Sequence, residues 1–322
     1  MSDELSRRTG EISAEKLALL VLRAKKKRAE APGVGRIPRR AASGPAPLSF
    51  AQQRLWVLDR LEPGSTAYNM PSVARLRGAL DAEAFERALG EIVRRHDALR
   101  TTFAEGAEGE PVQVVAPFAG FRLPFTDLAG LPQEQRRAEE RRLILAERRP
   151  YDLEHGPLFR ARLVRAGEEE HLLLLDIHHI VSDGWSYGVF FRELGALYEA
   201  FRAGRPSPLP ELPIQFADFA AWQREWLQGP VQQEQLAYWR QRLAGVPPAL
   251  ELPLDRLRPA VQTHRGEVAR LVLPPGLAAG LRELARREGA SPFMTLLAVF
   301  QLLLARLSGQ DDVVVGSPSA GR

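Results

Sequence analysis

Apolar and polar positions alternate along this chain with two periods, which predict strands in some segments and helices in others. Short apolar runs predict strands at residues 73–76, 112–115, 171–181, 271–273 and 312–315. Apolar residues three or four positions apart predict helices at residues 49–61, from 81 onward, and at 187–201, 216–227, 232–243, 277–287 and 292–307. Because strands and helices are mixed in order, the pattern predicts an α/β fold.

The segment from residue 171 to residue 201 carries the most informative pattern. Side chains of a strand point alternately to two faces, so His178 and His179 are expected on opposite faces. Apolar side chains fill most other positions on both faces, which is typical of a central, buried strand. Asp183 and Gly184 then interrupt the strand, and apolar residues at helical spacing follow. The pattern predicts a strand, a tight turn and an amphipathic helix.

The N-terminal region differs from the rest in composition. Residues 13–28 predict a short amphipathic helix capped by Ser13, with Lys and Arg in its last turn. Residues 31–47 are rich in Pro, Gly and Ala, which indicates a linker before a globular part that begins near Leu48. Residues 1–43 carry 11 basic and 5 acidic side chains, which leaves 33 and 35 for the remainder. Without interleaved aromatic residues or a nucleic-acid motif, this basic region is interpreted as a solvated helix end.

Composition excludes several classes of protein. The chain has 322 residues and no cysteine, so it has no disulfides, zinc thiolate site, iron–sulfur cluster or thiol nucleophile. No apolar stretch reaches the ~20 residues that span a bilayer, and the N-terminus lacks the apolar core of a signal peptide. We therefore expect a cytoplasmic protein with one large bilobal domain or two domains, and no membrane or nucleic-acid partner.

The histidine pair limits the chemistry that is available. His178 and His179 point to opposite faces of a strand, and no third His or Cys lies at ligand spacing, so a shared zinc is not expected. A single neutral imidazole at the end of a rigid strand suits general-base catalysis. No GxSxG motif supplies a nucleophile, which favours direct attack of one bound substrate on another. From the residues alone, a buried structural histidine and a capping Asp183 remain open alternatives.

Five segments together resemble one family. HHIVSDGWS, from His178 to Ser186, resembles the HHxxxDG core of condensation domains in nonribosomal peptide synthetases. Four other segments resemble further core motifs of that family, in the same order: LSFAQQRLWVLDRL at 48–61, RRHDALRTTF at 94–103, IQFADFAAWQREWL at 214–227 and GSPSAGR at 316–322. The residues after DG and the first motif are similar to the subtype that joins an L donor to an L acceptor.

The resemblance implies an α/β (α+β) bilobal fold similar to chloramphenicol acetyltransferase. In that family a tunnel between the lobes receives two thioesters from opposite sides, and the acceptor amine attacks the donor carbonyl to form an amide. No cofactor is expected to be bound directly, because partner carrier domains supply the phosphopantetheine. The implied partners are an upstream donor carrier domain on a separate chain and downstream acceptor carrier and adenylation domains.

The resemblance also assigns residues. His179 is expected to be catalytic, as a base or as the group that positions the amine. Asp183 is expected to pair with Arg95 or Arg100 and hold the loop that carries His179. Supporting roles fall to His178, hydrogen-bonded within the N-terminal lobe, and to Gly184, whose small size and backbone amide favour the thioester and its oxyanion. Two further residues are expected to line the substrate tunnel: Trp185, for which simple packing is the alternative, and Ser186.

The domain boundaries follow from the same resemblance. Residues 1–43 are expected to form the basic helix and linker, residues 44–225 a complete N-terminal lobe, and residues 226–322 part of the C-terminal lobe. Because the chain stops within the fifth motif, we expect a truncated, less stable and aggregation-prone second lobe, with activity of the chain alone in doubt. The basic helix is a candidate docking surface for the donor carrier.

Two other functions remain open at this point. One is a noncatalytic, condensation-like recruitment module, which the intact HHxxxDG residues argue against. The other is an acyltransferase that uses a free small-molecule nucleophile. An epimerisation domain shares HHxxxDG but differs in its other motifs.

Overall fold

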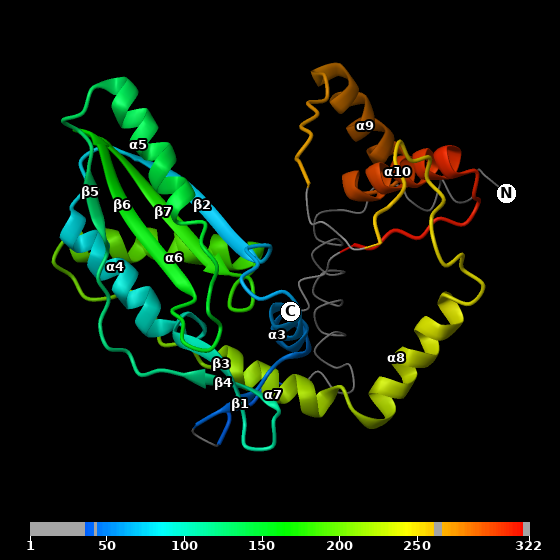
Figure 1. Ribbon diagram of the computed structural model, residues 1–322, viewed down its shortest axis with the longest axis horizontal. Helices are drawn as coiled ribbons and strands as arrows, with labels where there is room; N and C mark the ends of the chain where they lie inside the picture. Colours follow the sequence, from blue (N-terminus) through cyan, green and yellow to red (C-terminus); the bar gives the residue numbers. More distant parts are fainter. Residues whose placement is uncertain (1–35, 42–43, 261–265, 318–322) are drawn as a thin grey trace, which may run out of the picture. The chain divides into compact units, whose positions relative to one another are not determined.

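The computed structural model describes residues 36–41, 44–260 and 266–317, which fall into two compact units divided between Gln232 and Gln233. Figure 1 shows a first unit built on strands and a second unit that contains helices α9 and α10. The helix predicted at residues 13–28 lies outside the described residues. The predicted lobe boundary after residue 225 stays a prediction.

The larger sheet of the first unit places the histidine pair. Its four strands have the order β2-β7-β6-β5, and their bounds are Asn69–Arg77, Glu170–His178, Phe159–Gly167 and Phe125–Asp127. Strand β7 is antiparallel to both of its neighbours, whereas β5 is parallel to β6. Each residue of β7 from His171 to His178 is buried. The predicted central, buried strand is therefore confirmed.

Alternation along β7 separates two hydrophobic clusters. Leu173, Leu175 and Ile177 join the larger cluster with helices α4 (Ala82–Arg95) and α6 (Gly184–Arg202). Leu172 and Leu174 join a second cluster with helix α5 (Gln133–Ala146). The sheet is thus covered on both faces, and Figure 1 shows α5 on the opposite side of the strands from α4 and α6. Packing on both faces of the sheet holds β7 in place, and the histidine pair lies at the end of this strand.

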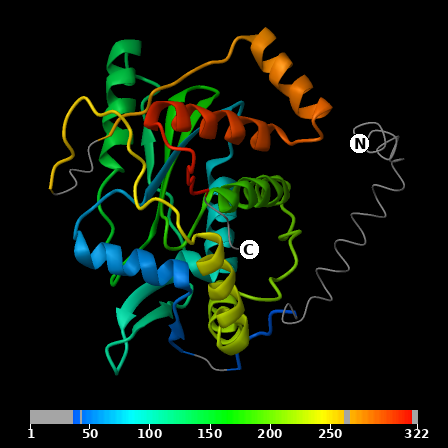
Figure 2. The same ribbon diagram turned by 90° about the vertical axis from the view of Figure 1, so that its right-hand side faces the viewer.

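A smaller sheet and two helices complete the first unit. The order β1-β4-β3 joins Ala46–Pro47, Pro111–Val115 and Thr101–Glu105. Leu55 of α3 (Phe50–Leu61) packs with Phe103 of β3, and both views show α3 beside this sheet (Figures 1 and 2). Helix α7 (Phe216–Trp226) contacts β1, and a short 3-10 helix, η1 (Asp97–Arg100), precedes β3. The predicted linker was too long at its C-terminal end, because Ala46 is buried and pairs with Gln113.

Helices dominate the described part of the second unit. Helix α8 (Gly229–Arg242) crosses the boundary between the units, and α9 (Pro275–Arg287) and α10 (Pro292–Ser308) follow it. Figure 2 shows α9 and α10 meeting at a sharp bend, which measures 105°. Within the described ranges no single helix is long and apolar enough to cross a membrane. The bent pair of α9 and α10 reaches that length and apolar composition only when the two helices are taken together.

The predicted strands at residues 271–273 and 312–315 are wrong, because neither segment forms a strand in the structure. A strand needs a neighbour that accepts its backbone hydrogen bonds. In the described sheets every strand belongs to the first unit, so neither segment has such a neighbour. Leu271 and Val272 are accordingly 87% and 88% exposed.

Candidate active site

The HHxxxDG residues occupy a turn between the central strand and a helix. His178 is the last residue of β7, His179 begins the turn, and Asp183 is the N-cap of α6. His178 is buried, whereas His179 is exposed. The predicted strand, turn and helix are confirmed, and the turn separates the environments of the two imidazoles.

His179 is held so that one ring nitrogen keeps a free lone pair. Its Nδ1 lies 2.9 Å from the backbone oxygen of Ser182, and its backbone amide donates to the oxygen of Tyr68 at 2.8 Å. A carbonyl oxygen can only accept, so Nδ1 carries the proton in the neutral ring. Nε2 is then left as an acceptor on an exposed residue. This tautomer can accept a hydrogen bond or a proton from an amine.

His178 has the opposite tautomer. The backbone amide of Ile180 donates to its Nδ1 at 3.2 Å, so the proton of the neutral ring lies on Nε2. Burial, with smaller contributions from the nearby His179 and Arg160, lowers the pKa of His178 to about 4. Its ring also makes an edge contact with Tyr151 at 5.7 Å between centroids. His178 is therefore neutral near pH 7 and packs inside the first unit.

Asp183 and Ser186 form a capping box at the start of α6. The Asp183 carboxylate accepts from the Ser186 amide at 2.8 Å and from its hydroxyl at 2.5 Å. Such a cap satisfies an amide that the first turn of a helix leaves without an internal partner. The arrangement fixes the C-terminal end of the turn that begins at His179.

Arg95 and Arg100 have other partners than those predicted. The buried Arg95 guanidinium lies 3.6 Å from the Glu193 carboxylate, which also contacts His96 Nε2 at 2.7 Å. Arg100 binds Asp97 at 2.5 Å and donates to backbone oxygens. Among the contacts that the described chain gives these two arginines, the predicted pair with Asp183 is not present. The physical reason is proximity. Arg95 of α4 lies beside Glu193 of the adjacent α6, and Arg100 lies beside Asp97 of its own 3-10 helix.

Gly184 and Trp185 lie at the exposed start of α6. A methyl group added at Gly184 would meet no heavy atom within 4 Å, so packing in this structure does not require glycine there. Trp185 is 73% exposed, which leaves its ring available to a ligand and gives no support to the packing alternative. The substrate roles predicted for Gly184, Trp185 and Ser186 stay predictions.

A buried polar group within β7 was not predicted from the sequence. Asp176 is 1% exposed and accepts from the Asn69 amide at 2.8 Å, and the Arg160 guanidinium lies 3.9 Å away. The Tyr151 hydroxyl donates to the backbone oxygen of Asp176 at 2.6 Å. The sequence does contain a sign of this group, because Asp176 is a charged residue within an apolar strand and such a residue requires buried partners. Its partners could not be read from the sequence, because they come from three other segments.

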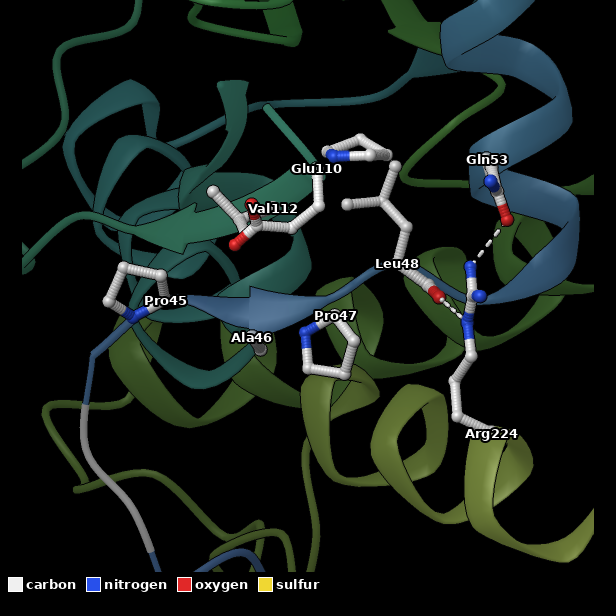
Figure 3. Close-up of a pocket in the computed structure, with 9 residues that line it drawn as sticks. Pro45, Ala46, Pro47, Leu48, Gln53, Glu110, Val112 and Arg224 are labelled. Carbon is white, nitrogen blue, oxygen red and sulfur yellow. Dashed lines mark hydrogen bonds between the residues drawn. The ribbon is translucent and has the colours of Figure 1, made fainter. Parts of the chain in front are cut away.

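No metal site is found among the described residues around this turn. Among the described residues, no group of three or more His, Asp or Glu side chains is arranged to hold a metal ion. A pocket of about 430 Å³ lies elsewhere, between β1, β4 and α7, where Arg224 donates to Leu48 and Gln53 (Figure 3). None of its lining residues belongs to the HHxxxDG turn.

Comparisons with known proteins agree with the motifs. A linear gramicidin synthase of Brevibacillus parabrevis is 54% identical over 277 residues, which is 86% of this chain and 4% of that protein. Phosphinothricin tripeptide synthetase PhsC of Streptomyces viridochromogenes is 46% identical over 323 residues, which is 99% of this chain and 30% of that protein. The chain therefore spans a small part of these curated relatives.

Solved structures share the fold. The X-domain from teicoplanin biosynthesis has a TM-score of 0.73 and 33% identity, over 85% of this chain and 60% of that chain. The first condensation domain of the CDA synthetase has a TM-score of 0.67 and 25% identity, over 84% of this chain and 64% of that chain. The family model described as Condensation domain matches residues 42–322. The chain belongs to the condensation domain family of nonribosomal peptide synthetases.

Proposed function

We propose that this chain forms an amide bond between a donor acyl or peptidyl thioester and an acceptor aminoacyl thioester. The observation that carries the proposal is the exposed His179, whose Nδ1 is bound to the Ser182 oxygen and whose Nε2 is free to accept. Membership of the condensation domain family supports the reaction class. The resemblance of the motifs further supports L-configured donors and acceptors.

The proposed reaction needs only one hydrogen-bond acceptor from the protein, the Nε2 atom of His179. The acceptor amine attacks the donor carbonyl, a C–N bond forms, and the C–S bond of the donor thioester breaks. The amine loses a proton and the departing pantetheine thiolate gains one, so no other reactant is needed. His179 Nε2 accepts the hydrogen bond of the attacking amine and can relay that proton, a role worth about 10²- to 10⁴-fold in rate.

Both substrates come from partner proteins in this proposal. Donor and acceptor carrier domains supply the phosphopantetheine arms, so the chain itself requires no resident cofactor. An adenylation domain loads the acceptor carrier with its amino acid. Such a reaction belongs in the cytoplasm, which agrees with a chain that has no cysteine.

Intact-protein mass spectrometry tests the proposal directly. A loaded donor carrier and a loaded acceptor carrier are mixed with the chain, with its His179→Ala variant, or with a His155→Ala control. His155 is an exposed residue that pairs with Asp152 outside the site. We expect the acceptor carrier to gain the donor acyl mass, His179→Ala to slow this at least about 100-fold, and His155→Ala to retain the rate.

Two outcomes would contradict the proposal. No transfer by the unaltered chain, with both carriers verified as loaded, would favour the recruitment module. Equal transfer to a free amino acid in place of the acceptor carrier would favour an acyltransferase that uses a free nucleophile.

A further inference from the structure

Tyr68, which directly precedes β2, and Asn69 and Met70, its first two residues, each contact a different part of the HHxxxDG region. The backbone oxygen of Tyr68 accepts from the His179 amide at 2.8 Å. The Asn69 side chain donates to Asp176 at 2.8 Å, and the backbone oxygen of Met70 accepts from the Tyr187 hydroxyl. The 68–70 segment therefore contacts β7 before the turn, the turn itself and the helix after it.

The register shows how these contacts enclose the turn. Asn69 is opposite His178 in the β2–β7 ladder, so the bond between Tyr68 and His179 extends the pairing one residue beyond β7. At the other end of the turn, Tyr187 lies in the first turn of α6, four residues after the Asp183 cap. The turn that presents His179 is thus held at both ends by neighbouring residues of the 68–70 segment.

The Tyr187 hydroxyl is suited to this contact. Its ring packs against the larger hydrophobic cluster, the one with α4 and α6, and its centroid lies 6.2 Å from that of the Phe191 ring. Burial, together with the nearby Asp176 carboxylate, raises the pKa of Tyr187 to about 12, so the phenol keeps the proton that it donates. A carbonyl partner such as that of Met70 requires a donor. The hydroxyl therefore acts as a fixed link between α6 and β2.

We propose that Tyr187 is a positioning residue, whose hydroxyl bond to Met70 fixes the orientation of His179 for amide transfer. This inference rests on the proposed function. The bond between His179 Nδ1 and Ser182 orients the imidazole relative to the turn, and the Tyr187 bond orients the turn relative to the sheet. A displacement of about 1 Å at a reacting group can cost about 100-fold in rate, so loss of one such link has a measurable effect.

Tyr187→Phe removes the hydroxyl and keeps the ring. The matched control is Tyr198→Phe on the same helix, where the hydroxyl accepts from the Asp81 amide at 3.0 Å. Tyr198 lies about 16 Å farther along α6, given a rise of about 1.5 Å per residue. Both variants lose one hydroxyl bond to the backbone, but only Tyr187→Phe loses a link to the 68–70 segment.

The transfer assay separates positioning from general destabilisation. For Tyr187→Phe we expect about a 10-fold fall in the maximal transfer rate, with half-saturation by the acceptor carrier unchanged within about twofold. For Tyr198→Phe we expect both quantities to stay within about twofold of the unaltered chain. Equal rates for Tyr187→Phe and the unaltered chain, or equal losses in the two variants, would overturn the inference.

Hydrogen exchange gives a second readout that does not depend on activity. The His179 amide should exchange about 10-fold faster in Tyr187→Phe, because its turn opens more often, and at an unchanged rate in Tyr198→Phe. Faster exchange without a loss of rate would make Tyr187 a structural residue only and overturn the positioning role. An unaltered chain that transfers nothing would overturn the proposed function, and the exchange comparison would still decide whether the link exists.

Discussion

Two adjacent histidines lie in different environments here because a strand ends between them. Strand alternation turns His178 into the core, where the Ile180 amide binds its Nδ1, and the turn leaves His179 exposed. Each ring is thereby fixed in one tautomer by a single backbone group, an amide for His178 and a carbonyl for His179. The chemistry of the pair is set by main-chain geometry more than by charged neighbours.

Stability of the first unit should fall in mild acid because of His178. Its folded pKa of about 4 lies below the ordinary value of about 6.5, so the unfolded chain takes up the proton first as the pH falls. The stabilisation is complete above pH ~6.5 and is lost between pH ~6.5 and ~4, by at most about 3 kcal/mol. His178→Asn, which keeps an acceptor near the Ile180 amide, should lose much less over this range.

Urea denaturation of both proteins at pH 7 and pH 4.5 measures the difference. His155→Asn serves as the control, because the hydrogen bond that the His155 ring donates to the Asp152 carboxylate raises the pKa of His155, which gives the opposite sign. The free energy of unfolding of this control should fall between pH 7 and pH 4.5 as much as that of the unaltered chain. An equal fall in the free energy of unfolding for His178→Asn and the unaltered chain would show that His178 is not held neutral by burial.

Residue-level prediction from the sequence succeeded for backbone patterns and failed for long side chains. The strand pattern placed His178 in the buried strand, whereas His179 lies in the turn just after the strand and not on its opposite face as predicted. The partners of Arg95 and Arg100 were not predictable, because a guanidinium on a flexible stem reaches several carboxylates and the fold decides which one is near. In this structure these carboxylates are Glu193 and Asp97.

At the scale of elements, the junction of β7 and α6 depends on the Asp183 cap. Asp183→Ala removes the acceptor of the Ser186 amide and should destabilise the first unit by about 1 kcal/mol. Asp183→Asn keeps a side-chain oxygen at the same place and should lose clearly less. The check is urea denaturation combined with amide exchange in the first turn of α6. Equal losses in the two variants would assign the effect to the charge of Asp183 and not to its capping bond.

Element prediction worked where one segment carried its own signal. Strand β7 was found because apolar residues fill both of its faces, and α4 because its apolar positions keep a strict helical spacing after the Asp81 cap. Helix α5 was missed because it has many charged residues and buries only Leu143. The two wrong strands in the second unit show the converse, since β-rich composition forms no strand without a partner.

At the scale of the whole molecule, the two units differ in how much they bury. The first unit contains all three described hydrophobic clusters. Among the described residues of the second unit only Ala285 and Thr295 are buried. Burial of apolar surface is the dominant favourable contribution to folding, so the units should differ strongly in stability.

We therefore expect the second unit to open well before the first. Helix α10 leaves Phe293, Met294, Phe300 and Leu303 between 46% and 59% exposed, which gives it little to lose on unfolding. Hydrogen exchange should show amides of α9 and α10 exchanging at least about 10-fold faster than those of β7, and a dye specific for apolar surface should bind the native chain. Phe300→Glu with Leu303→Glu should reduce dye binding and leave exchange in β7 unchanged. Equal protection of α10 and β7, with no dye bound, would mean that the exposed face of α10 is covered in solution and that the two units unfold together.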